Sequence, residues 1–78
     1  MKVTGDEKGV RFLKKMYMDD QKDTMGYITH AKKKGLAYFR AQHGEAYILY
    51  EIRCTDGKTY NVSKFQEGSL RPEEVQAL

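Results

Sequence analysis

The stretch AYILYEIRC, residues 46–54, gives the strongest structural signal in this sequence. It is rich in aromatic and β-branched residues, which favour a pleated, half-buried strand over a helix. Residues 58–65, KTYNVSKF, have the same character and follow a turn signal at residues 55–57, Thr-Asp-Gly. The two segments therefore predict a β-hairpin in the middle of the chain.

The register of this hairpin is constrained because a slip of one residue moves every side chain to the opposite face. A bulged three-residue turn closed by Gly57 pairs Ile52 with Tyr60 and Tyr50 with Val62, which keeps apolar residues together. A two-residue turn at residues 43–44 similarly pairs an aromatic strand at residues 36–42 with residues 46–54. The predicted inner face consists of Ala37, Phe39, Ala41, Ala46, Ile48, Tyr50, Ile52, Tyr60 and Val62.

The first third of the chain is ambiguous, because residues 10–18, VRFLKKMYM, show both a helical stripe and a partial strand alternation. Gly9 before this segment and the polar residues after it favour a strand. Residues 25–35, MGYITHAKKKG, predict another strand that opens at a glycine. The alternative is an α+β fold, with an N-terminal helix on a three- or four-stranded antiparallel sheet.

The whole pattern resembles the Src-homology-3-like small β-barrels, particularly the Tudor and KOW-type versions. The resemblance covers residues 9–72 and consists of GVRF, a polar loop, GYI, a basic turn, an aromatic strand, YEIRCTDGKTYNV and a closing SLRP. It implies a mainly β fold, a five-stranded barrel with a binding role. The chain has no tryptophan and no acidic-aromatic signature of the polyproline-binding type, so we do not expect recognition of proline-rich peptides.

One domain is expected over residues 1–78, with a flexible segment at 1–8, the barrel at 9–72 and a tail at 73–78. Pro72, followed by two glutamates, predicts a short helical turn that leads into this tail.

Composition narrows the class of protein further. The chain has 78 residues, of which 40% are hydrophobic and 32% charged, with a net charge of +3, as is typical of a small globular domain. No apolar run approaches the roughly 18 residues of a membrane span, and the N-terminal residues lack the apolar stretch of a signal peptide. We therefore expect a cytoplasmic protein that does not associate with membranes.

Few residues suggest catalysis or metal binding. His30 and His43 lie in or beside predicted turns, and Cys54, the single cysteine, lies near a hairpin end without an activating neighbour. No Cys/His spacing resembles a zinc site, and the acidic residues 19–23 do not match a calcium-binding loop. We therefore expect a non-enzymatic protein without cofactor or metal.

Positive charge is concentrated in the predicted sheet. Residues 26–64 carry seven basic and three acidic side chains, a local net charge of +4. Alternation places aromatic and basic side chains together on the outer face, beside a turn of three lysines. The candidate binding residues are Lys32, Lys33, Lys34, Tyr38, Arg40, Tyr47, Leu49 and Arg53.

Such a face suits two kinds of partner. Cations can neutralise phosphates while rings and guanidinium planes stack on bases, which favours nucleic acid. Tyrosine and arginine are also common in the centres of protein interfaces. The alternative is therefore an adaptor or inhibitor that binds a protein through the same face. The N-terminal segment or the C-terminal tail covering this face is a third interpretation. We expect a monomer or a weak homodimer, because a small sheet has exposed edges.

Overall fold

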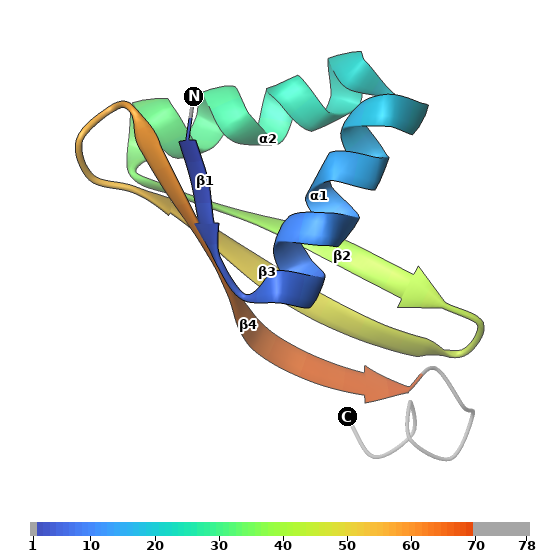
Figure 1. Ribbon diagram of the computed structural model, residues 1–78. Coiled ribbons are helices and arrows are strands. Elements are labelled where there is room, and N and C mark those ends of the chain that lie inside the picture. The colour runs from blue at the N-terminus through green and yellow to red at the C-terminus, as the bar shows by residue number, and fades with distance from the viewer. Residues whose placement is uncertain (1, 70–78) are drawn as a thin grey trace.

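The computed structural model describes residues 2–69 and consists of two helices and four strands (Figure 1). In chain order the elements are β1 (Lys2–Gly5), α1 (Glu7–Asp19), α2 (Gln21–Lys34), β2 (Leu36–His43), β3 (Ala46–Cys54) and β4 (Thr59–Ser69). The predicted helical turn after Pro72 and the tail at 73–78 lie outside the described residues.

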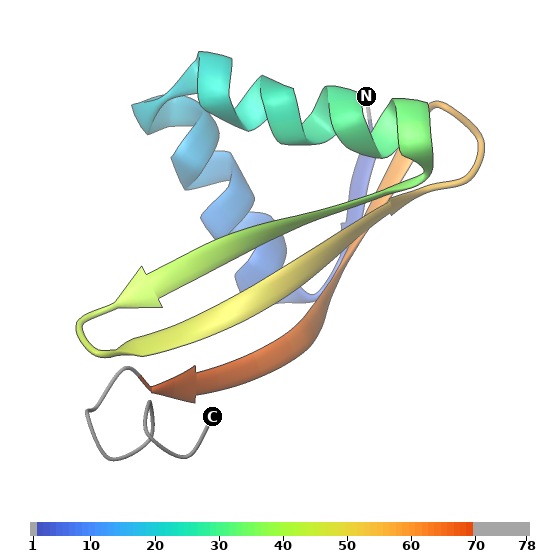
Figure 2. The same ribbon diagram turned by 180° about the vertical axis from the view of Figure 1, so that it is seen from behind.

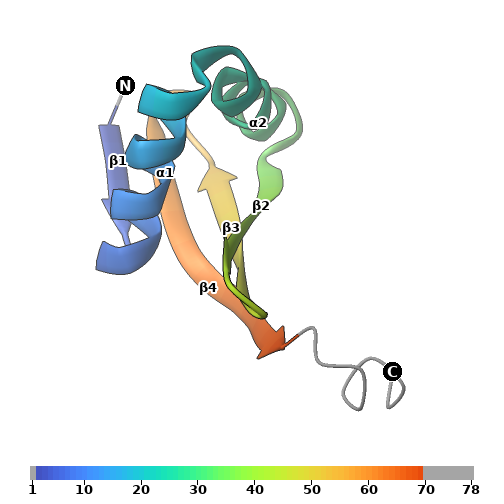
Figure 3. The same cartoon turned by 90° about the vertical axis from the view of Figure 1, so that its right-hand side faces the viewer.

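The four strands form one open, mixed sheet in the order β1-β4-β3-β2. Strand β1 pairs in parallel with β4, and the other two pairs are antiparallel. Figures 1 and 3 show α1 beside β1 and α2 at the end of the sheet where β2 begins. Both helices pack on the same side of the sheet, because Leu13 of α1 and Ile28 of α2 join Phe39 and Ile52 in one core cluster. In the opposite view, Figure 2, β2, β3 and β4 lie in front of α1, and α2 crosses only the upper end of the sheet. The predicted mainly β, five-stranded barrel is therefore wrong, and the fold is a two-layer α+β structure.

The two N-terminal strands of that prediction are helices. Asp6 caps α1 by accepting a hydrogen bond from the Gly9 amide at 2.9 Å, and Asp20 caps α2 by accepting one from the Asp23 amide at 3.0 Å. Gly35 ends α2 in the left-handed conformation, with φ of 85°. Local capping and packing of the helical stripe outweigh the partial alternation at residues 10–18. The α+β alternative also differs from the structure, which has a second helix and a parallel strand pair.

The strand β1 is fixed by a close approach to β4. Gly5 has φ of 112°, and a Cβ atom at this position would lie 2.1 Å from the carbonyl oxygen of Val62. The next amide, that of Asp6, donates to the same oxygen at 2.7 Å. Only glycine allows the chain to turn into α1 here while the parallel pairing with β4 is retained.

Both predicted hairpin registers are wrong by two residues. Phe39 pairs with Tyr50 rather than Ile48, and Ile52 pairs with Val62 rather than Tyr60. Because side chains alternate with a period of two, this shift leaves every residue on its predicted face. The predicted inner face is buried against the helices, except that Ala46 is exposed and Ile48 is half-buried.

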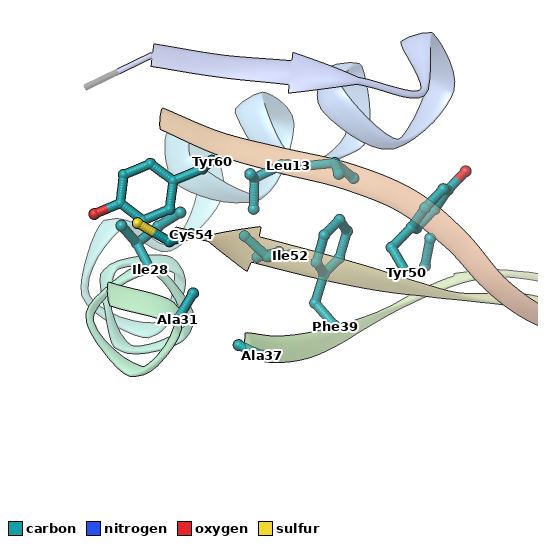
Figure 4. Close-up of a cluster of buried hydrophobic side chains, with 11 residues drawn as sticks. Leu13, Ile28, Ala31, Ala37, Phe39, Tyr50, Ile52, Cys54 and Tyr60 are labelled. Carbon is teal, nitrogen blue, oxygen red and sulfur yellow. The ribbon is translucent and has the colours of Figure 1, made fainter. Parts of the chain in front are cut away.

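The core lies between the sheet and the helices. Figure 4 shows Phe39 between Ile52 and Tyr50, with Leu13 of α1 above them and Ile28 of α2 near Cys54. The rings of Phe39 and Tyr50 are 5.2 Å apart, and Phe12 packs at 6.2 Å from Phe39. Large side chains from both layers therefore meet in one apolar cluster.

Two tyrosines of the core make the free energy of unfolding depend on pH in the alkaline range. Burial raises the pKa of both Tyr50 and Tyr60 above 10, and neighbouring Cys54 adds to the increase at Tyr60. In the unfolded chain these phenols ionise near pH 10. The unfolded state therefore loses protons first, and the free energy of unfolding should fall as pH rises above about 10.

We expect the variant Tyr60→Phe, which keeps the ring, to weaken this pH dependence. The measurement is urea unfolding of both proteins at pH 7 and at about pH 11. A stability loss of the same size in the variant and in the original protein would contradict the prediction.

Candidate binding face

Five of the predicted binding residues lie together on the side of the sheet that no described helix covers. Tyr38 and Arg40 belong to β2, whereas Tyr47, Leu49 and Arg53 belong to β3. Their neighbours at alternate positions, such as Phe39 and Ile52, are buried in the core. We call this surface of β2, β3 and β4 the open face.

A further aromatic residue, Phe65, belongs to the open face. The pairing of β3 with β4 shifts between Leu49 and Tyr50, which leaves Phe65 as the extra residue of a β-bulge. Its ring centroid lies 5.1 Å from that of Tyr38, at an interplanar angle of 57°. Since the two rings start from β4 and β2, they meet above β3. Tyr38 is 39% exposed and Phe65 is 55% exposed.

Arginine and tyrosine form a second pair on this face. The Arg40 guanidinium carbon lies 4.9 Å from the ring centroid of Tyr47, within the range of a cation–π contact. Tyr47 itself lies against Gly68, where an added Cβ atom would be 2.8 Å from the tyrosine hydroxyl oxygen. Gly68 therefore provides the space for the Tyr47 ring, and Arg40 covers that ring on the open face.

The charge of the open face is smaller than the sequence suggested. Arg53 forms an ion pair with Glu51, whose side chain is largely buried on the same face. Glu51 is paired with Tyr38 across the strands, below the place where the Tyr38 and Phe65 rings meet. Arg40 makes no ion pair with a described residue, so it is the cation of this face available for an anionic partner.

The three lysines do not lie together with the open face. Lys32, Lys33 and Lys34 form the last turn of α2 rather than a turn between strands, and there they interact favourably with the helix dipole. Lys34 lines a hollow at the edge of β2 together with Tyr38 and His30. Lys32 lines a different hollow, with Lys2 and Lys58. Of the lysines in this turn, Lys34 is the one that the structure brings near the aromatic residues.

The structure also places the residues considered for catalysis or metal binding. Cys54 is a free, buried thiol, and His30 and His43 are exposed on α2 and at the end of β2. Asp20 caps α2 rather than forming a loop for a cation. Within residues 2–69, no group of three or more His, Cys, Asp or Glu side chains is positioned to hold a metal. Neither α1 nor α2 has the length and apolar composition of a membrane-spanning helix.

No protein-family model, no curated protein and no solved structure matches this chain. The open face is therefore interpreted from the geometry of its own residues.

Proposed function

We propose that this protein is a small binding module that takes up single-stranded nucleic acid on the open face of its sheet. The observation that carries the proposal is the pair of exposed rings, Tyr38 and Phe65, on a sheet surface that no described helix covers. Unpaired bases stack on such rings irrespective of sequence, each stack contributing about 1–3 kcal/mol. Arg40 adds a cation beside the rings for a phosphate or a base.

Single strands fit this surface better than duplexes. The bases of a duplex are stacked on one another, so their flat faces are not accessible to Tyr38 and Phe65. A duplex would have to bind through its phosphates, and the open face offers few cations because Glu51 neutralises Arg53. The structure therefore supports aromatic stacking as the main source of affinity, with a smaller ionic contribution.

This balance predicts a shallow dependence on salt. If Arg40 and Lys34 neutralise about two phosphates, the affinity for a single strand should fall only about sevenfold between 50 and 200 mM salt. The measurement is fluorescence anisotropy with labelled oligothymidylate of about ten nucleotides, and with a duplex of equal length. We expect the single strand to bind at least about tenfold more tightly than the duplex. Absence of single-strand binding at low salt, or equal binding of the duplex, would contradict the proposal.

The alternative partner, a protein, is favoured by the apolar character of the same residues. Leu49 is half-buried on this face, and its strand partner Gln66 follows the exposed Phe65. Apolar and aromatic side chains that lie close together are typical of the core of a protein interface. A protein partner would lose affinity on substitution of Leu49 or Tyr47 but little on substitution of Lys34. Retention of one specific protein after nuclease treatment, together with no oligonucleotide binding, would favour this alternative.

A further inference from the structure

A separate hollow lies at the end of the molecule where β1 begins, α2 ends and the β3–β4 turn projects. Figures 1 and 2 both show these three segments close together. Backbone contacts join β1 to the turn, since the Lys2 amide donates to the carbonyl oxygen of Lys58 at 3.1 Å and Lys2 pairs with Thr59. Side chains of α2 line the same hollow as these residues. The hollow has a volume of about 780 Å³, within the usual range of small-molecule sites.

Three lysines from three different elements line this hollow. Lys2 comes from β1, Lys32 from the last turn of α2 and Lys58 from the turn before β4. None of them forms an ion pair with any residue that the structure describes. Thr29 of α2 adds a neutral hydroxyl, whereas no carboxylate is among the lining residues.

The nearest acidic residue in the turn, Asp56, already has other partners. One of its carboxylate oxygens accepts hydrogen bonds from the amides of Lys58 and Thr59, at 2.8 and 2.7 Å. These bonds hold the pKa of Asp56 below its usual value. Asp56 thus shapes the turn that presents Lys58, while Lys2 and Lys32 still face the hollow together with it. With Asp56 counted, the site retains a net charge of +2.

From this arrangement we infer that the hollow between Lys2, Lys32 and Lys58 is a binding site for a dianionic phosphate group. Three ammonium groups supply up to nine hydrogen-bond donors and the charge that a phosphate monoester needs. The inference is independent of the open face, because the site lies at the end of the sheet and on the side of the helices. The phosphate can belong to a small molecule or to the terminus of a nucleic-acid strand.

The test is an NMR titration of the ¹⁵N-labelled protein with inorganic phosphate, in which phosphate replaces chloride at constant ionic strength. We expect saturable shifts of the amides of Lys2, Lys58 and Thr59. The double variant Lys32→Gln/Lys58→Gln should bind phosphate at least about tenfold more weakly.

The matched control is Lys8→Gln/Lys33→Gln, which removes the same charge from exposed positions that do not line the hollow. Its phosphate affinity should equal that of the original protein. Equal weakening in both double variants, or no saturable shift at the hollow, would overturn the inference.

A second experiment identifies the source of the phosphate and distinguishes binding at this site from binding at the open face. Oligothymidylate with a 5′-phosphate is compared with the same strand ending in a 5′-hydroxyl. Tighter binding of the phosphorylated strand, lost in Lys32→Gln/Lys58→Gln, assigns the site to strand ends. Equal binding of the two strands, with inorganic phosphate still bound at the hollow, assigns it to phosphorylated small molecules. Phosphate binding with no binding of either strand supports this inference while contradicting the proposed function.

Discussion

Replacing Gly9 with alanine is expected to destabilise the protein by about 1–3 kcal/mol, because the added methyl group overpacks the core. Its Cβ atom would lie 2.7 Å from two ring carbons of Tyr50 and 2.8 Å from a methyl group of Val62. Both side chains are almost fully buried, so neither can move aside easily. Gly9 therefore sets how closely α1 approaches the sheet.

The control for this substitution is Gly26→Ala in α2. A Cβ atom at Gly26 meets no atom within 4 Å, and alanine is favoured over glycine in a helix by up to about 1 kcal/mol. Urea unfolding should therefore give opposite changes in the free energy of unfolding for the two variants. Equal effects of the two substitutions would show that α1 does not pack on Tyr50 and Val62 as described.

Removing both exposed rings of the open face should abolish most single-strand binding. Loss of two base stacks, at about 1–3 kcal/mol each, predicts at least about a thirtyfold decrease in affinity for the variant Tyr38→Ser/Phe65→Ser. Both side chains are more than one-third exposed, so the fold should survive the change. The measurement is the anisotropy titration with labelled oligothymidylate.

A suitable control is Tyr17→Ser, which removes a tyrosine of α1 that is 38% exposed, nearly the same as Tyr38. Tyr17 lies in the helix layer, away from the open face, so its loss should leave oligonucleotide affinity unchanged. If Tyr17→Ser weakens binding as much as the double variant does, general loss of exposed aromatic surface explains the effect. The open face would then have no special role.

The faces of the central strands could be predicted from the sequence, although their exact pairing could not. Apolar alternation places Phe39 and Ile52 in the core in every register that differs from the observed pairing by an even number of residues. Turn geometry selects among these registers, and both predicted registers differ from the structure by two residues. The error does not affect the open face, which depends only on the alternation.

The sequence does not predict the two helices because Gly9 and Gly26 each precede a segment that is typical of a strand. Both glycines lie inside helices, Gly9 for close packing on the sheet and Gly26 at an open position. The informative signals were Asp6 and Asp20, each of which caps a helix. The pairing of β1 with β4 joins residues more than fifty positions apart, and no local pattern predicts such a pair.

The candidate site was predicted in part. Five residues of the predicted site share the open face, but Lys32, Lys33 and Lys34 lie in the last turn of α2, which packs on the other side of the sheet. Phe65 was overlooked, although continuing the alternation from Tyr60 and Val62 places it outward. The ion pair between Glu51 and Arg53 also lowers the charge that composition alone suggested.

The location of the bound strand tests the central claim most directly. In an NMR titration of the ¹⁵N-labelled protein with unphosphorylated oligothymidylate, we expect amide shifts concentrated in β2, β3 and β4 around Tyr38, Leu49 and Phe65. The amide signals of α1 should not shift, because α1 lies behind the sheet, away from the open face. Amide shifts confined to the helices would contradict the account. The absence of any shift at an oligonucleotide concentration high enough to reveal weak binding would contradict it as well.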